Sequence, residues 1–452
     1  MKNIAVIGSG AYGSYIIDTL LKKDPTLKIT LFEVGNKHIK NESDIGYKTN
    51  MLNREYLATS KGRFFGFGGA TNKWGGCILL FSKNDFQSPG NFLNDIVDLN
   101  IKYKDTVHKK FKFQDSFNDH AINNDFFTKH GIWLGYSRRN LFRFFKIASY
   151  KQVTLCQDAR VIKFNFENEK IKELVYLKDG KEYTKSFDKY FLAAGAFESH
   201  RILLNSGISN NGIFTFSDHI SQPMFKIKGS TVIGKDDFAL IVKGASLRSN
   251  RIVGEIEEHS YLIHPIFNKN YTFFQNLKLL LFKGVFTWKL VGSIFQDIPS
   301  AILFAYYFFV KKRIYAYKNE WAFYIDIENP REQNYIKLSS ERDRYGQRGL
   351  DLNFEVNEKA TYIFNEARKK LKEYLDANHV NYESCNENIQ IQKVEDTYHP
   401  FGMMSDFDSI NDYFTKYPDL LIVNSGILPR AGGINSTAAM FPVIEEYVNR
   451  YF

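Results

Sequence analysis

The first thirty-five residues constrain the fold of this chain more than any other stretch. Residues 4–7 form a short apolar run typical of a buried strand, and the sequence G-S-G-A-Y-G follows at residues 8–13. Residues 14–23 carry an apolar stripe with helical spacing, residues 28–32 form a second apolar strand, and Glu33 closes it. The stretch therefore predicts a β-α-β unit with G-x-G-x-x-G at its first turn and an acid 20 residues after the last glycine.

Each part of this unit has a physical reason in the binding of a dinucleotide. Gly8 allows a tight turn, Gly10 lets the backbone approach a pyrophosphate, and Gly13 lets the helix pack closely on the strand. The helix N-terminus presents free N–H groups to the phosphates, and Glu33 can accept hydrogen bonds from ribose hydroxyls. We predict a dinucleotide site. The alternative is a glycine-rich turn in another α/β protein, and the motif alone does not separate NAD from FAD.

Composition places the chain among soluble globular proteins. Its 452 residues exceed what one hydrophobic core usually holds, so two domains are expected. Apolar residues make up 44% and charged residues 24%, which is ordinary for this class. The net charge of +10 has two interpretations. It indicates an anionic partner (nucleic acid, a membrane surface or a phosphorylated substrate) or a basic bias spread over the surface, and the second is favoured.

Cysteine usage and the N-terminus indicate a reducing compartment. Cys77, Cys156 and Cys385 are far apart, their number is odd, and no pair has the spacing of metal ligands. Neither a disulfide framework nor a metal site is therefore expected. The chain starts directly with the first apolar strand and shows no signal-peptide pattern. We expect a cytoplasmic protein without a bound metal.

A second glycine-dense stretch lies at residues 62–76, where six of fifteen residues are glycine. Each glycine costs about 1 kcal/mol inside a helix, so this stretch is not the interior of a regular element. Flexible linkers are rich in glycine and serine, whereas this one also contains Phe64, Phe65 and Trp74. It predicts backbone that wraps closely on something flat or charged. Residues 189–207 predict a strand, a small-residue turn and a helix, which lets the chain pass close to a dinucleotide.

An apolar segment stands out at residues 277–313. Residues 277–295 predict a helix that Pro299 breaks, and residues 298–310 form a thirteen-residue run without a charge. Thirteen residues are too few to span a bilayer, which needs about 20. Lysines inside and after the segment favour a basic, aromatic helical pair on a membrane surface. A buried helical hairpin and a cap over the substrate site remain open as alternatives.

The C-terminal segment is expected to return to the first unit. Residues 420–423 predict a buried strand, residues 424–437 contain a glycine turn, and residues 438–448 predict a closing helix. His399, followed by Pro400, precedes them. A neutral imidazole accepts a proton near pH 7, so His399 is a candidate base, with a purely structural role as the alternative.

Five motifs in order along the chain resemble those of the glucose–methanol–choline (GMC) oxidoreductases, which are FAD enzymes. The motifs are the N-terminal glycine motif with Glu33, the second glycine signature at residues 66–76, the internal motif at 193–207, the histidine segment at 399–402 and the segment at 432–437. The resemblance is spread over the whole length and is weakest in the middle.

The resemblance implies a two-domain α/β fold, with a Rossmann-like FAD-binding domain of the ββα type and an inserted antiparallel-sheet substrate domain. The FAD domain is expected from residues 1–98, 150–222 and 395–452, and the substrate or cap domain from residues 99–149 and 223–394. The implied function is FAD-dependent oxidation of an alcohol group, on a sugar or glycoconjugate, to a carbonyl.

The resemblance also implies roles for individual residues. His399 is the expected base for the hydroxyl proton, the flavin N5 takes the hydride, and Asn435 hydrogen-bonds the substrate oxygen. The residues expected to bind FAD are Gly8, Gly10, Ala11, Tyr12, Gly13, Glu33, Gly68, Gly69, Ala70, Thr71, Asn72, Trp74, Gly75, Gly76, Val161, Ala194, Gly195, Asn424, Ser436 and Thr437.

The chain departs from the family pattern at several positions. Met403 and Met404 stand where many members have Gly-Thr, Asn424 replaces a usual Asp, and Ser436 replaces a usual Pro. Lys73 stands where some members attach FAD through a His, so we expect non-covalent FAD. These changes bear on substrate and activity more than on the fold.

Two other functions stay open. One is a NAD-linked dehydrogenase, against which the second glycine stretch argues. The other is a non-catalytic flavin-binding remnant with an interaction role, against which the pair of His399 and Asn435 argues. We expect a small-molecule alcohol or sugar as substrate, no nucleic acid, and a peripheral membrane contact through residues 277–313. The electron acceptor that reoxidises the flavin stays open.

Overall fold

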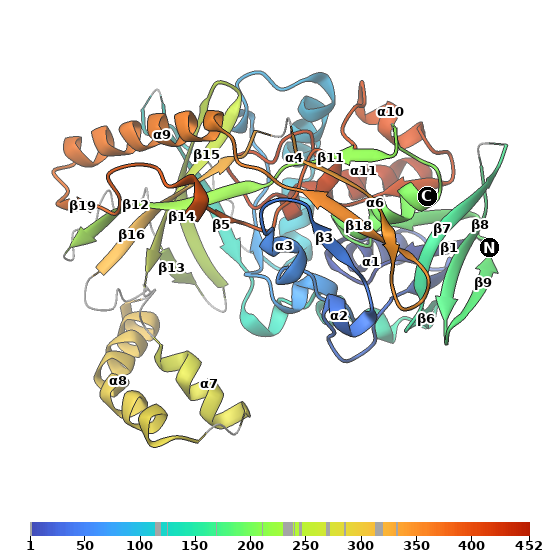
Figure 1. The fold of residues 1–452 in the computed structure, drawn as a ribbon, viewed down its shortest axis with the longest axis horizontal. Helices are drawn as coiled ribbons and strands as arrows, with labels where there is room; N and C mark the ends of the chain where they lie inside the picture. The colour runs from blue at the N-terminus through green and yellow to red at the C-terminus, as the bar shows by residue number, and fades with distance from the viewer. Residues whose placement is uncertain are drawn as a thin grey trace.

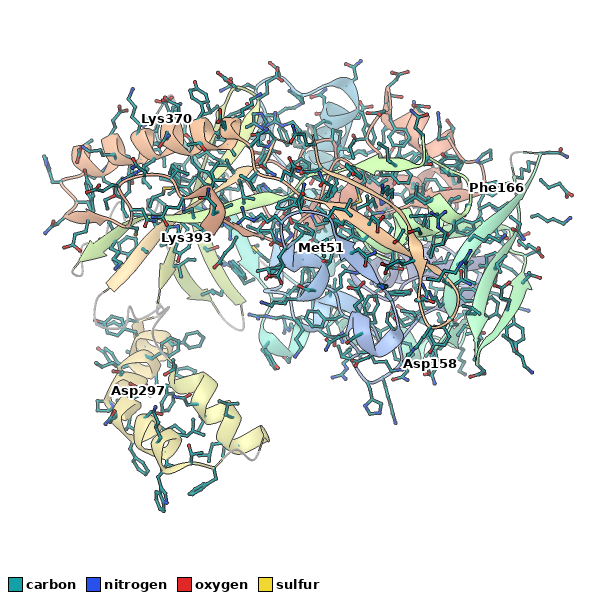
Figure 2. All side chains as sticks on the ribbon, viewed as in Figure 1. Met51, Asp158, Phe166, Asp297, Lys370 and Lys393 are labelled. Atoms are coloured by element: carbon teal, nitrogen blue, oxygen red, sulfur yellow. The ribbon has the colours of Figure 1, made fainter. Side chains whose placement is uncertain are left out.

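The computed structural model describes most of the chain, and Figure 2 shows its side chains. The described residues are 2–113, 119–123, 125–168, 170–209, 211–228, 238, 240–243, 246–267, 272–283, 286–311, 320–330 and 333–452. Residues 284–285 and 312–313 of the apolar segment lie outside these ranges.

A five-stranded parallel sheet forms the layer that the N-terminal unit predicts (Figure 1). Its strands come from the beginning, the middle and the end of the chain, and every neighbouring pair is parallel. The order is β21 (Leu420–Ile422), β10 (Lys189–Leu192), β1 (Asn3–Ile7), β2 (Lys28–Phe32) and β6 (Val153–Cys156). Short apolar runs favour this arrangement because a parallel sheet is buried on both faces.

Helices and a small sheet pack on this layer. Helix α1 (Ala11–Lys23) lies against α11 (Phe441–Tyr451), where Tyr15 stacks on Phe441 with 4.3 Å between the ring centroids. A three-stranded antiparallel sheet contacts β2, because Tyr176 meets Phe32 edge to face at 5.1 Å. The strands of that sheet are β7 (Arg160–Glu167), β8 (Lys170–Lys178) and β9 (Lys181–Lys185).

Two sheets with mainly antiparallel pairing make up the other half of the molecule, and in one of them β3 runs parallel to β18. A nine-stranded sheet contains β19 (Tyr382–Ser384), β12 (His219–Lys228), β16 (Glu320–Glu328), β15 (His259–Phe267), β14 (Ser246–Ile256), β5 (Phe127–Trp133) and β4 (Cys77–Ile78) in that order, with β13 (Leu240–Lys243) and β20 (Glu395–Asp396) paired beside it. A four-stranded sheet joins β11 (Ile213–Thr215), β17 (Tyr335–Arg342), β18 (Arg348–Asn353) and β3 (Thr49–Met51). Helix α9 (Glu358–Ala377) runs along the large sheet (Figure 1).

The remaining α-helices among the described residues are mostly short. They are α2 (Glu42–Ile45), α3 (Leu57–Ser60), α4 (Asn91–Lys110), α5 (Leu141–Phe144), α6 (Ala196–Asn205) and α10 (Ile410–Thr415). Helix α4 packs on α11, where the Tyr103 hydroxyl donates to Glu446 at 2.7 Å.

The predicted fold class is confirmed: a Rossmann-like parallel layer stands beside a separate antiparallel sheet. The domain boundaries stay a prediction. Strand β4, from the range 1–98, pairs antiparallel with β5 in the nine-stranded sheet, and β3, from the same range, pairs parallel with β18 in the four-stranded sheet. Helix α4, whose residues after 98 were expected in the substrate domain, packs against α11 beside the parallel layer. These three elements show that the two halves share segments.

The apolar segment forms two helices that project from the rest of the molecule (Figure 1). They are α7 (Phe273–Lys283) and α8 (Trp288–Tyr306), and a π-helical turn at Tyr307–Lys311 continues α8. The predicted break at Pro299 is wrong, because Pro299 lies inside α8. A proline removes one backbone hydrogen bond, and the turns on both sides continue the helix across it.

The boundary between the helices lies earlier, at Thr287, whose hydroxyl accepts a hydrogen bond from the Leu290 N–H at 3.2 Å. The continuous helix Trp288–Lys311 has 24 residues and a mean hydropathy of 1.3, so by length and composition it could cross a membrane. The expectation of a run too short to do so is therefore wrong. The buried hairpin is also wrong, since none of α8 is buried.

Replacing Gly13 by alanine should destabilise the protein. A Cβ atom at Gly13 would lie 1.8 Å from the carbonyl oxygen of Gly8, so α1 and β1 would have to separate. We expect a loss of about 1–3 kcal/mol in the free energy of unfolding, measured by urea denaturation without added ligand.

The matched control is Gly10→Ala, because a Cβ there meets no atom within 4 Å. Its unfolding free energy should stay within about 0.5 kcal/mol of the native value. Equal stability of the two variants would contradict the close packing at Gly13.

Candidate active site

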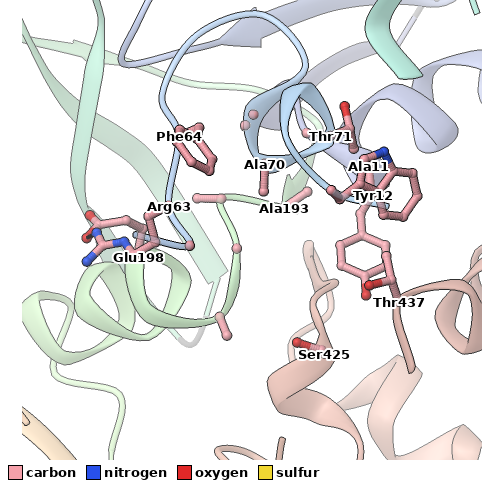
Figure 3. Close-up of a pocket in the computed structure, with 18 of the residues that line it drawn as sticks. Ala11, Tyr12, Arg63, Phe64, Ala70, Thr71, Ala193, Glu198, Ser425 and Thr437 are labelled. Atoms are coloured by element: carbon pink, nitrogen blue, oxygen red, sulfur yellow. Dashed lines mark hydrogen bonds and ion pairs between the residues drawn. The ribbon is translucent and has the colours of Figure 1, made fainter. Parts of the chain in front are cut away.

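A cavity of about 640 Å³ lies between the first glycine turn, the second glycine stretch and the C-terminal segment (Figure 3). Many of the predicted site residues line it. They are Gly8, Gly10, Ala11, Tyr12, Glu33, Gly69, Ala70, Thr71, Trp74, Gly75, Gly76, Val161, Ala194, Gly195, His399, Asn435 and Thr437. These residues come from motifs far apart in the sequence, and the fold brings them together around one cavity.

The first glycine turn shapes one end of the cavity for an anionic group. Gly8 has φ +97°, a conformation that favours glycine. The N-terminus of α1 has no side-chain cap, and its first N–H groups therefore need another acceptor. Open space at Gly10 and at Gly195 leaves room for a ligand where a side chain would intrude. These features fit the pyrophosphate of FAD.

Glu33 sits beside this turn as a buried acceptor. One carboxylate oxygen accepts hydrogen bonds from the Ser9 N–H at 3.0 Å and the Ser9 hydroxyl at 2.6 Å. The other accepts from the N–H groups of Gly35 at 3.0 Å and Gly66 at 3.1 Å. Burial raises the pKa of Glu33, and these donors oppose that shift. Glu33 thus fixes the position of the second glycine stretch, and its role towards a ribose stays a prediction.

The second glycine stretch curves around the cavity. Its residues Gly69–Asn72 form a 3-10 turn, and Asn72 donates to the Gly69 carbonyl at 2.8 Å. The Trp74 indole N–H donates to the Arg139 carbonyl at 2.8 Å. In Figure 3, Ala70 and Thr71 lie on one side of the cavity and Thr437 lies beside the Tyr12 ring. Its aromatic side chains and exposed backbone line the cavity and suit contact with a flat aromatic ring such as a flavin.

Five predicted cofactor residues do not line the cavity. Gly13 and Gly68 serve the packing of the two glycine turns, and Asn72 ties its own turn together. Asn424 is fully buried and caps the next turn by accepting from the Gly426 N–H at 2.8 Å, which leaves Ser425 at the cavity wall. Ser436 is buried beside Asn435.

His399 and Asn435 meet at the other end of the cavity. Their side chains are 2.5 Å apart, between Asn435 Nδ2 and His399 Nε2. Arg251 of β14 donates to Asn435 Oδ1 at 2.8 Å. Because a guanidinium only donates, Oδ1 faces Arg251 and Nδ2 faces the histidine. His399 Nε2 is then an acceptor, and the imidazole is neutral with its proton on Nδ1.

The electrostatic surroundings keep His399 neutral. Burial is the main cause that lowers its pKa to about 3, with His219 and Arg251 acting in the same direction and Asp326 opposing them. Arg251 is only 5% exposed and lies over the Trp133 ring at 5.7 Å. Among the described residues it has no carboxylate partner. A neutral imidazole is the form that a general base requires, and here its Nε2 lone pair accepts from Asn435.

Two buried carboxylates hold the segments that carry this pair. Asp218 accepts from the backbone N–H of His399 at 2.9 Å and from the Tyr56 hydroxyl at 2.5 Å. Tyr398, just before the histidine, has φ +66°, a conformation that costs a non-glycine residue about 1 kcal/mol. Asp218 therefore holds a strained turn that sets the direction of His399.

The segment of Asn435 is held in the same way by Glu328. This carboxylate accepts from the N–H groups of Ala431 and Gly432, both at 2.8 Å, and from Arg430 at 2.7 Å. The sequence gives no signal for Asp218, Glu328 or Arg251, because each is an isolated polar residue in or beside a strand. The alternation of polar and apolar residues along a strand shows which face of the sheet each side chain is on. It does not show which distant segment packs against that face.

The comparisons with known proteins bear on the fold. The crystal structure of pyridoxine 4-oxidase from Mesorbium loti is similar to the whole chain, with a TM-score of 0.57 and 13% sequence identity over 100% of this chain and 99% of that one. The likeness shows that this chain and that oxidase share an overall fold. No protein-family profile matches the sequence, and no curated protein matches it.

Replacing Arg251 by methionine should raise the pKa of His399. The native pKa is expected well below 6.5, and the loss of a nearby positive charge makes protonation easier. NMR titration of histidine-labelled protein measures this pKa, with His399→Gln identifying the signal.

The matched control is Arg248→Met, three residues earlier on β14 and therefore on its other face. It should leave the His399 titration unchanged. An Arg251→Met protein with the native titration would contradict the arrangement of Arg251, Asn435 and His399.

Proposed function

We propose that the protein is an FAD-dependent oxidoreductase that oxidises an alcohol group, on a sugar or glycoconjugate, to a carbonyl. The observation that carries this proposal is the hydrogen-bonded pair of His399 and Asn435 at one end of a cavity whose other end fits a pyrophosphate. The likeness of the fold to an alcohol-oxidising enzyme, pyridoxine 4-oxidase, supports the reaction class.

FAD would lie along the cavity without a covalent bond. The first glycine turn and the N-terminus of α1 would hold the pyrophosphate, Glu33 would face the ribose, and residues 66–76 would enclose the flavin ring. When bound, FAD supplies the acceptor for the hydride of the alcohol. Lys73 lines the cavity, and its position where some GMC members carry a linking histidine supports non-covalent binding.

The protein groups would handle the proton and the position of the substrate. His399 Nε2 would accept the hydroxyl proton, with the substrate hydroxyl replacing the Asn435 amide as its hydrogen-bond partner. Asn435 Nδ2 has two protons, of which one faces His399 and the other can donate to the substrate oxygen. Arg251 fixes the amide in this orientation and places a positive charge near the oxygen as it becomes negative.

The purified protein should show the visible spectrum of bound oxidised flavin, and anaerobic addition of its alcohol should bleach it. A panel of sugars, sugar conjugates and pyridoxine identifies the substrate, and oxygen or a dye as acceptor shows how the flavin is reoxidised. Denaturation should release the flavin, since no covalent bond is expected. A protein that stays colourless after reconstitution with FAD contradicts the proposal. Binding of NAD in its place would support the NAD-linked dehydrogenase.

His399→Gln should slow bleaching by about 10²–10⁴-fold, the usual contribution of a general base, while the flavin spectrum stays unchanged. Stopped-flow absorbance measures the rate. His130→Gln is the matched control, because His130 lies on β5 and does not line the cavity. Flavin that binds but is bleached by no alcohol would favour the non-catalytic remnant.

Gly10→Ala should weaken FAD binding about tenfold or more, since its Cβ points into the space that fits the pyrophosphate. Quenching of flavin fluorescence during titration of the apoprotein measures the affinity. The native stability expected for this variant separates loss of binding from loss of folding. Native affinity in Gly10→Ala would place the pyrophosphate elsewhere.

A further inference from the structure

The segment of the projecting helices carries about half of the exposed large hydrophobic side chains in the described part of the chain. The helical hairpin, defined as α7, α8 and the π-helical turn, projects away from both sheets with side chains around it (Figures 1 and 2). Among the described residues, eleven of the twenty-one exposed large hydrophobic side chains lie between residues 281 and 310. A large exposed apolar patch of this kind usually marks a site that binds another protein or a membrane.

One stripe along α8 and the π-helical turn concentrates this surface. Trp288, Phe295, Ile302 and Phe309 recur every seven residues, and their side chains are 81%, 66%, 63% and 66% exposed. Spacing of seven residues places side chains close to one line along a helix. The hairpin therefore presents a continuous aromatic and aliphatic face along its longer helix.

A polar strip follows the first turns of α8 beside α7, next to the half-buried Leu290, Ile294 and Phe304. Ser293 lies there with Lys289, Gln296 and Ser300, and Asn276 of α7 donates to the Ser293 hydroxyl at 3.0 Å. The helix is thus amphipathic, and the contact between the two helices leaves the apolar stripe uncovered. A helix with one apolar and one polar side is typical of helices that lie in the plane of a membrane–water interface.

Charge favours an anionic lipid surface as the apolar surroundings. Residues 272–313 contain six basic residues, at 278, 283, 289, 311, 312 and 313, and one acid, Asp297. Lys289 and Lys311 are exposed in the structure. Basic residues that flank an apolar helix attract anionic head groups, and Trp288 suits the boundary between head groups and acyl chains.

The roots of the hairpin set its orientation. Phe267 at the end of β15 pairs with Trp321 near the start of β16, so the chain leaves the large sheet and returns to it at one place. If α8 crossed the bilayer, α7 would also have to cross it, because both ends of the hairpin start from the same sheet. Helix α7 has 11 residues and is about 16 Å long, whereas the hydrocarbon layer is about 30 Å thick. The hairpin is therefore too short to cross twice.

We propose that the helical hairpin binds the surface of an anionic lipid bilayer, with α8 parallel to the membrane and its stripe of Trp288, Phe295, Ile302 and Phe309 in the acyl layer. None of the described hairpin residues lines the cavity, so membrane binding is separate from the cofactor site. The proposal does not depend on the proposed reaction.

Co-sedimentation with vesicles tests the binding. The full-length protein should sediment with vesicles of phosphatidylcholine and phosphatidylglycerol, and less with phosphatidylcholine alone. Phe295→Glu with Ile302→Glu should lower the bound fraction by about tenfold or more, because two charges would enter the acyl layer. The matched control is Leu52→Glu with Ile101→Glu, two exposed apolar residues outside the hairpin, which should bind as the native protein does.

Circular dichroism confirms that each variant is folded. Native protein that never sediments with vesicles overturns the proposal, as does equal loss of binding in the control variant. Self-association in solution that the hairpin variant abolishes, without vesicle binding by the native protein, would assign the stripe to a second copy of the chain and also overturn it.

Fluorescence quenching tests the orientation. In a Trp288→Phe background, Phe295→Trp and Phe309→Trp place a reporter at two points fourteen residues apart on the stripe. Lipids brominated at a shallow acyl position should quench both reporters equally if α8 lies parallel to the membrane. Strong quenching of one reporter by deeply brominated lipids and of the other by shallow ones would mean a crossing helix and overturn the orientation.

Discussion

The carboxylate of Glu33 is the contact on which the cofactor cavity depends. It follows β2, accepts from Ser9 in the first glycine turn, and accepts from Gly66 in the second. Burying a carboxylate is costly unless donors replace the lost water, and here four donors converge on it. Because two glycine turns meet at this carboxylate, its contacts set the spacing between them.

The reactive end of the cavity depends on the register of two strands. His219 of β12 and Glu328 of β16 are direct cross-strand partners, and Asp218 comes just before His219. Asp218 holds the segment of His399, while Glu328 holds the segment of Asn435. The pairing of β12 with β16 therefore sets how the two side chains approach each other. A slip of one residue would move both carboxylates to different positions and separate the pair.

Local sequence signals predicted the parts of the fold that depend on near neighbours in the chain. Such parts include the two glycine turns, the strands at 4–7 and 28–32, and the return of the C-terminal segment to the first unit. The pair of His399 and Asn435 was predicted from the resemblance to a family. Arg251, 184 residues from Asn435, carries no such signal, because its importance lies in a contact between distant segments. The helix boundary was misplaced for a related reason. Pro299 is a strong local signal, whereas the cap at Thr287 is weak and was overlooked.

The assembly of the parallel layer from both ends of the chain has a consequence for biosynthesis. Tyr15 on α1 stacks on Phe441 and donates to Glu445, which is 430 residues later. At 5–20 residues per second, a ribosome needs roughly 20–90 s to reach α11 after α1 has emerged. During that interval Tyr15 can contact Phe111 and Phe145, but its partners on α11 are still missing. The parallel layer is therefore completed only after β21 and α11 have been synthesised.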